Sequence, residues 1–195
     1  VCTWCWGSEP IIRKLKWRFG DQIKISYIMG GLVGDIHEFY DRANDIGGDP
    51  DESNANIAKH WLEASEKHGM PVRTEGFQLF TDAHPSSYPQ NIAYKAAQME
   101  GEELAHKFLR RMREATATEA RQTNRRDVLI GIATEVGLDI ASFIEKLEDG
   151  SARKAFKEDL RFARKHHVRA FPSFRLSYKH EHIMLHGYQS YEALK

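Results

Sequence analysis

The chain lacks a net charge: its 195 residues carry 28 lysine and arginine side chains against 28 aspartate and glutamate side chains. A neutral protein exerts no general attraction on nucleic acids or anionic membranes, so we expect neither as a partner. The chain also lacks a run of the ~20 apolar residues that cross a bilayer. Hydrophobic residues nevertheless make up 41% of the sequence, which is typical of a folded domain and argues against intrinsic disorder.

Cysteine is scarce, and both cysteines, Cys2 and Cys5, lie in the opening segment VCTWCWGSEP. A single CxxC motif cannot supply the multiple cross-links of a small secreted protein. No secretory signal is visible, and we expect further residues upstream of Val1 in the natural protein. We therefore expect a cytoplasmic protein. The CxxC motif itself has three candidate roles: a redox pair, half of a zinc site, or a structural disulfide.

The sequence favours the redox role and leaves the other two open. Structural zinc requires two further sulfur or imidazole ligands, yet there is no second CxxC and no histidine pair at zinc-finger spacing from the first. A structural disulfide between residues three apart would constrain little of the unfolded chain. We expect no bound metal or organic cofactor.

The CxxC motif is expected at, or one turn before, the N-terminus of a helix. Ser8 can cap a helix that begins near Pro10, and apolar residues recur every four positions up to Phe19. Unpaired backbone N–H groups at a helix N-terminus stabilise an anion, so they favour the thiolate that attacks disulfides. We predict that Cys2 is the nucleophile and that Cys5 is the more buried, resolving cysteine.

The rest of the chain divides into segments of different periodicity. Alternation predicts a strand over 22–32, and apolar spacing predicts an almost wholly helical region from about 54 to 167. The basic segment 153–167 is interpreted as the solvated face of a helix, because acidic residues interrupt it. A hairpin is expected from 171–178 and 183–187, followed by a final helix that begins within SYEALK.

The segment CTWCWGSEPIIRKLK (2–16) resembles the active-site segment of the DsbA-like family of thioredoxin-fold proteins. MGGL after the expected strand and HPSSYPQNIAYKAAQMEG (84–101) resemble that family as well. The resemblance implies an α/β thioredoxin fold with a large inserted all-helical domain. Its parts would be a first thioredoxin-like segment (1–35, its first strand missing upstream), the helical insertion (36–165) and a second thioredoxin-like segment (166–195).

The segment ARKHHVRAFPSF (163–174) resembles the residues around the cis-proline of the same family. The resemblance implies that Pro172 is that proline and faces the CxxC motif. The backbone of Phe171 would then be free to pair with an extended substrate chain. Trp4 is expected to contribute to the same substrate site, whereas Trp6 either shapes the groove or packs beneath the helix.

These observations lead to the hypothesis of a thiol–disulfide oxidoreductase that acts on a protein or small-thiol disulfide. The nearest branches of the family are the FrnE-like and the YjbH/SpxH-like proteins, and the latter deliver a redox-responsive transcription factor to the ClpXP protease. The alternative hypothesis is therefore an adaptor for a protease or a transcription-factor client, or a redox-sensing binding protein, in which the CxxC motif is not essential. The sequence gives no basis for predicting the oligomeric state.

Overall fold

A computed structural model describes the whole chain, residues 1–195. The helices are α1 (Thr3–Gly7), α2 (Glu9–Phe19), a 3₁₀ turn (Gly20–Gln22), α3 (Pro50–His68), α4 (Tyr88–Glu100), α5 (Glu102–Glu119), α6 (Arg126–Glu135), α7 (Ile140–Glu148), α8 (Ser151–Lys165) and α9 (Tyr191–Leu194). The strands are β1 (Tyr40–Asp41), β2 (Ile46–Gly47), β3 (Ser173–Tyr178) and β4 (Glu181–His186). None of the helices combines the length and the apolar run that crossing a membrane requires.

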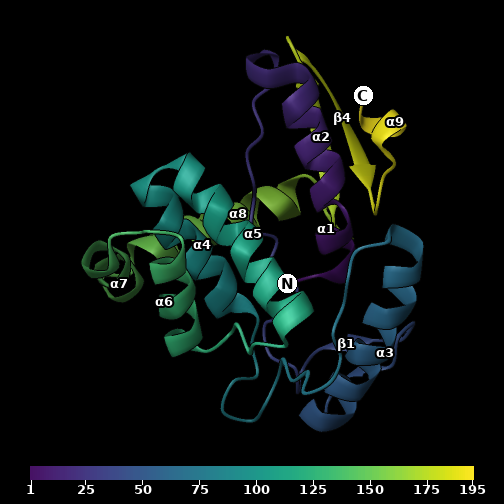
Figure 1. The fold of residues 1–195 in the computed structure, drawn as a ribbon, viewed down its shortest axis with the longest axis vertical. Coiled ribbons are helices and arrows are strands. Elements are labelled where there is room, and N and C mark those ends of the chain that lie inside the picture. Colours follow the sequence, from purple (N-terminus) through teal and green to yellow (C-terminus); the bar gives the residue numbers. More distant parts are fainter.

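Helices α1 and α2 follow each other with only Ser8 between them (Figure 1). The hydroxyl and the backbone N–H of Ser8 both donate to the carbonyl of Trp4, which closes α1. Pro10, which has no N–H, lies in the first turn of α2, where a missing donor costs least. Cys2 therefore precedes the first turn of α1, and Cys5 lies inside it.

Helices α4 to α8 form a bundle around the larger hydrophobic core (Figure 1). Helix α4 supplies Ala93, Tyr94, Ala96 and Ala97, all fully buried, and packs against α5, α7 and α8. The short alanine side chains allow the neighbouring helices to approach closely. The expected helices over this part of the chain are confirmed.

A second core joins α3 to the active-site helix α1. It contains Trp6, Ile57, Trp61 and Phe77, and α3 contacts α1 directly. The expectation of near-continuous helix from 54 to 167 is wrong for residues 69–87, which form an irregular loop. Buried Asn54 of α3 explains how this loop is stabilised, because its amide oxygen accepts the backbone N–H groups of residues 79 and 80.

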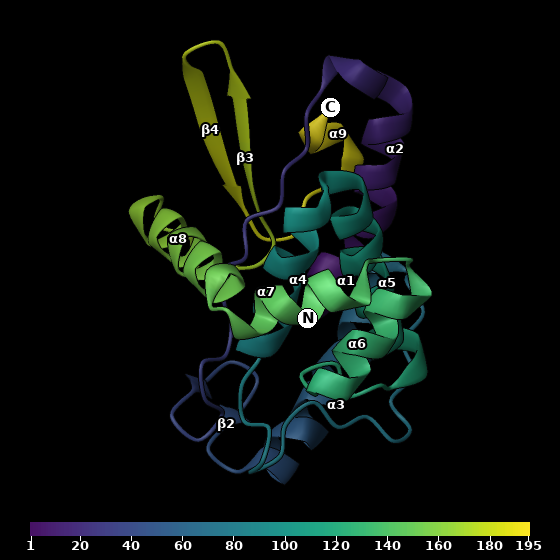
Figure 2. The ribbon, with the colours of Figure 1, turned by 90° about the vertical axis from the view of Figure 1, so that its left-hand side faces the viewer.

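The hairpin of β3 and β4 is confirmed and pairs antiparallel from Ser173 opposite His186 to Tyr178 opposite Glu181. It projects away from the bundle above the end of α8 (Figure 2). The short final helix α9 follows it and packs against α2, where Lys14 lies 4.0 Å above the ring of Tyr191. The hairpin thus connects the end of the bundle to the outer side of the active-site helices.

The expected strand over 22–32 does not form. The segment shows the expected alternation, since Ile25, Tyr27 and Met29 are more buried than their neighbours. A strand also needs a ladder partner, and no other strand pairs with these residues. The N–H of Met29 instead donates a hydrogen bond to the buried carboxylate of Asp159 at 2.8 Å. Alternation therefore predicted an extended backbone with one inward face, but not its pairing.

Candidate functional site

The two halves of the candidate site come from opposite ends of the chain. Cys2 lies at the N-terminus of α1, and its Sγ donates to the carbonyl oxygen of Phe171 at 3.6 Å. The Phe171–Pro172 peptide bond is cis in the structure. The Phe171 carbonyl faces the thiol, and Pro172 leads into β3. The structure thus brings together three of the residues that the sequence predicted as site residues.

The thiols of Cys2 and Cys5 have different acidities. A hydrogen bond from the Cys5 thiol lowers the pKa of Cys2 to about 7, and the backbone N–H groups of Cys5 and Trp4 lower it further against the effect of burial. The same hydrogen bond, together with burial, raises the pKa of the Cys5 thiol. Cys2 is therefore the residue that carries a thiolate near neutral pH, and both thiols are free.

The acidity of Cys2 leads to a testable expectation for alkylation. Because only the thiolate reacts with iodoacetamide, the rate at Cys2 should follow a titration curve with its midpoint near pH 7. Between pH 7 and pH 5 the rate should fall by about 50-fold, whereas free cysteine has a pKa of ~8.5. Mass spectrometry of the N-terminal peptide, fragmented between the two cysteines, measures each site. A Cys5→Ala variant tests the cause because alanine has no donor, and a midpoint that does not rise in this variant contradicts the assignment.

A buried ion pair lies beneath the CxxC motif. Glu9, four residues after Cys5, is 4% exposed, and its carboxylate bonds directly to the guanidinium of Arg113 on α5. Arg110 approaches the other carboxylate oxygen at 3.5 Å. Arg113, Cys2 and Cys5 together line a small cavity of about 100 Å³ beside the motif. The positive charge of Arg113 favours the Cys5 thiolate. The sequence analysis missed both residues, because nothing local indicates that an arginine 104 residues away is the partner of Glu9.

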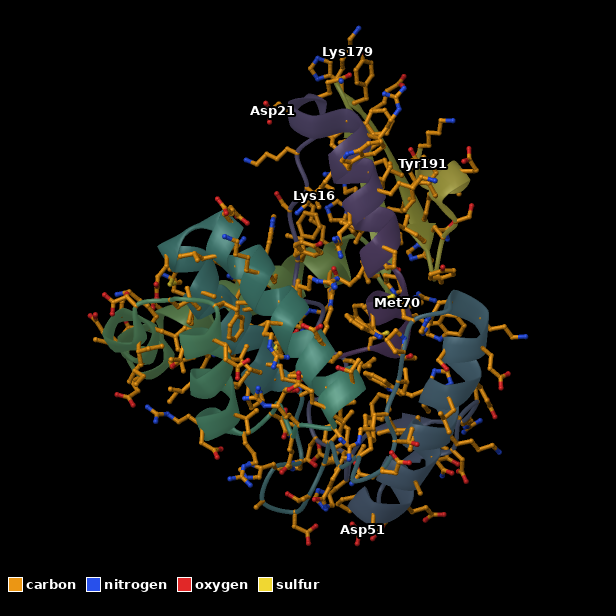
Figure 3. The ribbon with its side chains drawn as sticks, viewed as in Figure 1. Lys16, Asp21, Asp51, Met70, Lys179 and Tyr191 are labelled. Atoms are coloured by element: carbon orange, nitrogen blue, oxygen red, sulfur yellow. The ribbon has the colours of Figure 1, made fainter.

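A second polar contact joins the same two helices. Lys16 on α2 points toward α5, and its Nζ donates to Nδ1 of His106 at 3.1 Å (Figure 3). Burial, together with the charge of Lys16, lowers the pKa of His106 and so favours the neutral ring that accepts this bond. Helix α5 of the bundle is thus attached to the active-site helices at two levels.

Trp4 lies against an aromatic cluster rather than alone in a groove. Its ring lies 6.3 Å from His60, 5.9 Å from His68 and 5.7 Å from Tyr188, measured between ring centroids. Trp6 is 2% exposed and donates its indole N–H to the carbonyl of residue 71, so it packs beneath the helix. The structure therefore resolves the open alternative for Trp6 and leaves Trp4 at the edge of the site.

His68 fixes the position of the active-site helix relative to α3. Its Nδ1 accepts the N–H of Met70 at 3.1 Å, so Nε2 carries the proton and donates to the hydroxyl of buried Thr3 at 3.2 Å. Burial lowers the pKa of His68, which favours this neutral form. A Cβ at Gly7 would lie 2.5 Å from the same ring, so only glycine allows this close approach.

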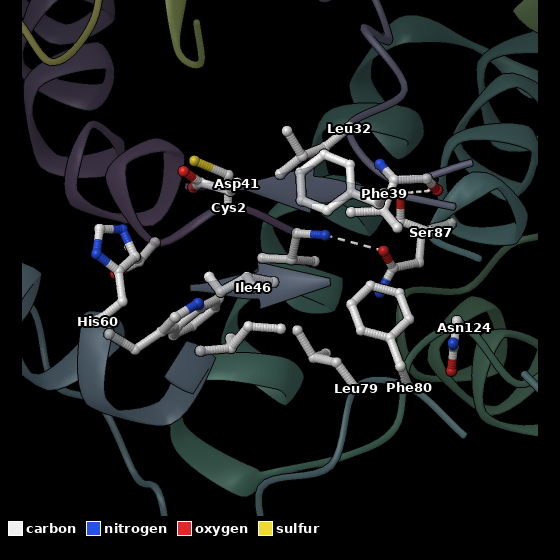
Figure 4. Close-up of a pocket in the computed structure, with 16 residues that line it drawn as sticks. Cys2, Leu32, Phe39, Asp41, Ile46, His60, Leu79, Phe80, Ser87 and Asn124 are labelled. Carbon is white, nitrogen blue, oxygen red and sulfur yellow. Dashed lines mark hydrogen bonds between the residues drawn. The ribbon is translucent and has the colours of Figure 1, made fainter. Parts of the chain in front are cut away.

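An apolar cavity of about 110 Å³ adjoins Cys2 (Figure 4). Cys2 lies at its edge, and most of its wall comes from α3 and from the loops before and after it, with Val1 and the start of α4 completing the lining. The apolar lining residues other than Cys2 are Val1, Leu32, Val33, Phe39, Ile46, Ile57, Trp61, Leu79 and Phe80. The cavity offers space for an apolar group next to the nucleophilic sulfur. No sequence signal indicated it, because its walls come from segments that lie far apart in the chain.

The ring of Phe171 packs on the backbone of Gly30, where a Cβ would meet a ring carbon at 2.0 Å. This contact holds the peptide bond that faces Cys2 against the MGGL segment. No group of three or more histidine, cysteine, aspartate or glutamate side chains has an arrangement that would hold a metal ion.

Comparison with known sequences matches the whole chain to one family. The family described as thioredoxin matches residues 1–195. The ClpXP adapter protein SpxH of Halalkalibacterium halodurans is 30% identical over 176 residues, covering 89% of this chain and 55% of that protein. SpxH of Bacillus subtilis is 27% identical over 197 residues, covering 98% of this chain and 61% of that protein. This chain therefore spans less than two thirds of the length of these relatives.

Two solved structures share the fold at low sequence identity. A candidate protein disulfide isomerase from Nitrosomonas europaea superposes with a TM-score of 0.81 at 17% identity, covering 100% of this chain and 89% of that one. The cytosolic disulfide reductase DsbM from Pseudomonas aeruginosa superposes with a TM-score of 0.73 at 21% identity, covering 95% and 84%. Both are similar to this chain in architecture, a thioredoxin fold with a large helical insertion.

Proposed function

Because the chain belongs to the DsbA-like branch of the thioredoxin family, we propose that it catalyses thiol–disulfide exchange at Cys2 and Cys5. One observation carries the proposal: the thiol whose pKa is lowered to about 7 lies 3.6 Å from the carbonyl oxygen that precedes Pro172. A reactive sulfur beside backbone groups that have no other hydrogen-bond partner is what exchange with a protein disulfide requires.

The proposed exchange has two steps. The Cys2 thiolate attacks one sulfur of the substrate disulfide, the substrate S–S bond breaks, and the departing substrate thiolate takes up a proton. The Cys5 thiol loses its proton and attacks Cys2, which releases the second substrate thiol and leaves a Cys2–Cys5 disulfide. The substrate is reduced and the protein oxidised, and the reverse sequence oxidises a dithiol. A protein or small thiol would restore the starting state.

The substrate chain is proposed to lie along Phe171 and Pro172. The N–H of Phe171 has no hydrogen-bond partner, and its carbonyl bonds only to the Cys2 thiol, so both groups are available to an extended chain. Trp4 would border this chain on the side of α3. The cavity beside Cys2 supports an apolar side chain near the substrate cysteine. A cytoplasmic location is part of the same proposal.

Alkylation under denaturing conditions tests whether the two cysteines form a redox pair. After incubation of the reduced protein with hydroxyethyl disulfide, we expect no alkyl group, and after subsequent treatment with reductant we expect two. The mass of the intact protein distinguishes these states. Two alkyl groups already present before the reductant is added would contradict redox activity. Zinc retained by the protein would instead favour a structural metal site.

A second candidate function is an adapter that presents a client protein to the ClpXP protease. It is favoured by the similarity of the chain to the ClpXP adapter proteins SpxH of Halalkalibacterium halodurans, Bacillus cereus and Bacillus subtilis. In this case the thioredoxin fold would act as a binding surface and the CxxC motif would be a sensor or would have no role. The two candidates differ in their dependence on the Cys2 sulfur, so replacing Cys2 with serine separates them.

A further inference from the structure

The outer face of α8 concentrates positive charge in a protein without net charge. Six lysine and arginine side chains on this helix are exposed: Arg153, Lys154, Lys157, Arg161, Arg164 and Lys165. At 3.6 residues per turn, their positions fall within an arc of about 120° of the helix surface. We call these six residues the basic face of α8. The buried residues Phe156, Asp159 and Ala163 lie on the opposite side of the helix.

Most of these charges have no partner in the protein. Only Arg161 forms an ion pair, at 3.7 Å from Glu158, which lies just outside the arc. The second acidic residue of the helix, Asp159, points inward. Its carboxylate forms an ion pair with Lys95 and accepts a hydrogen bond from the N–H of Met29. The acidic residues that interrupt the basic run in the sequence therefore do not neutralise the basic face, and the face is more than a mixed, solvated surface.

The stability of the helix does not explain the positions of the first cations. Arg153 and Lys154 are the third and fourth residues of α8, and its first turn contains no acidic residue. Cations at a helix N-terminus oppose the helix dipole, whereas acidic residues there stabilise it. Like charges three or four residues apart, as at Lys154 and Lys157, also repel each other. The arrangement costs local stability, which is the pattern expected of a surface that binds something negative.

We propose that the basic face of α8 is a docking surface for an acidic segment of a partner protein. The face is about 18 Å long, since it runs from Arg153 to Lys165 at about 1.5 Å per residue. An extended segment of about five residues has the same length. Carboxylates on such a segment would pair with the unpartnered cations. The proposal does not depend on redox activity at Cys2.

The structure favours a protein segment over the other two anionic partners. A membrane surface is disfavoured because the apolar side of α8 is buried in the bundle and cannot insert. A duplex nucleic acid is disfavoured because the remainder of the chain carries a net negative charge that offsets the basic face, whereas nucleic-acid-binding domains are strongly basic overall. A short acidic segment touches the basic face alone and avoids this repulsion.

A charge reversal with a matched control tests the proposal. The variant Arg153→Glu/Lys154→Glu/Lys157→Glu should fold, because glutamate favours a helix and suits its first turn. The control Arg13→Glu/Arg18→Glu/Lys24→Glu makes the same charge change at three exposed cations that form no ion pair. The probe is a fluorescent 12-residue peptide of alternating glutamate and glycine, titrated by anisotropy at 50 mM salt. A glutamine version of the peptide, a 20-base-pair duplex and vesicles with anionic lipid are the comparison ligands.

We expect the glutamate peptide to bind in a salt-dependent manner and the glutamine peptide not to bind. The α8 variant should weaken binding by about 10-fold, as the loss of three exposed ion pairs implies, and the control variant by less than about 2-fold. Circular dichroism should show that both variants are folded. The proposal would be overturned if both variants weakened binding equally, or if the peptide did not bind. It would also be overturned if the duplex or the vesicles bound more tightly than the peptide.

Discussion

Replacing Cys2 with serine is expected to abolish disulfide exchange. The serine hydroxyl remains protonated at neutral pH and does not attack a disulfide, so the rate should fall on the order of 10³-fold or more, as for other enzymes that lose their nucleophile. The thiol that remains, Cys5, cannot substitute for Cys2, because burial still raises its pKa after the Cys2 thiol is removed. The measurement is the rate at which the reduced protein reduces a fluorescent protein disulfide in the presence of excess thiol.

The matched variant Cys5→Ser should behave differently. Cys2 can still attack, but no second thiol resolves the mixed disulfide, so a covalent adduct with the substrate should accumulate on nonreducing gels. Wild-type rates from Cys2→Ser would show that the oxidoreductase proposal is wrong. If Cys2→Ser also leaves ClpXP degradation of a bound client unchanged, the adapter function gains support. The pair of variants therefore separates the two candidate functions.

The sequence predicted which segments meet at the candidate site better than it predicted the surroundings of that site. The CxxC motif and its position at a helix N-terminus can be recognised from a short stretch, because helix starts depend on local backbone physics. The role of the Phe171–Pro172 segment was predicted only from its resemblance to the DsbA-like family. The structure places these stretches together, with the Cys2 sulfur 3.6 Å from the Phe171 carbonyl. The domain boundaries at residues 35 and 165 stay a prediction.

The parts that sequence could not predict depend on long-range contacts. The alternation over 22–32 was visible, but whether an extended segment finds a ladder partner depends on the rest of the fold. The loop over 69–87 was mistaken for helix, since the hydrogen bonds that Asn54 donates to and accepts from it come from another element. The cavity beside Cys2 and the pairing of Glu9 with Arg113 likewise join segments far apart in the chain.

Replacing Arg113 with methionine is expected to lower the free energy of unfolding by about 3 kcal/mol. Methionine matches the size of the arginine stem but leaves the Glu9 carboxylate buried without its main partner, and breaking one side of a buried pair typically costs ~3–5 kcal/mol. The value at the lower end reflects Arg110, which still lies 3.5 Å from Glu9. Urea denaturation, followed by tryptophan fluorescence, measures the change. The control Arg125→Met removes an exposed pair with Asp127 and should cost no more than ~1 kcal/mol.

The double variant Glu9→Leu/Arg113→Met separates the cost of an unpaired charge from the loss of attraction. Because apolar residues can replace a buried ion pair at little cost, the double variant should be more stable than Arg113→Met alone. Its chemistry should still be impaired: Arg113 favours the Cys5 thiolate, so without it Cys5 should resolve mixed disulfides more slowly. A double variant that regains stability but accumulates the mixed disulfide would establish Arg113 as a positioning residue for the resolving step. A double variant with wild-type resolution would limit the ion pair to joining α2 to α5.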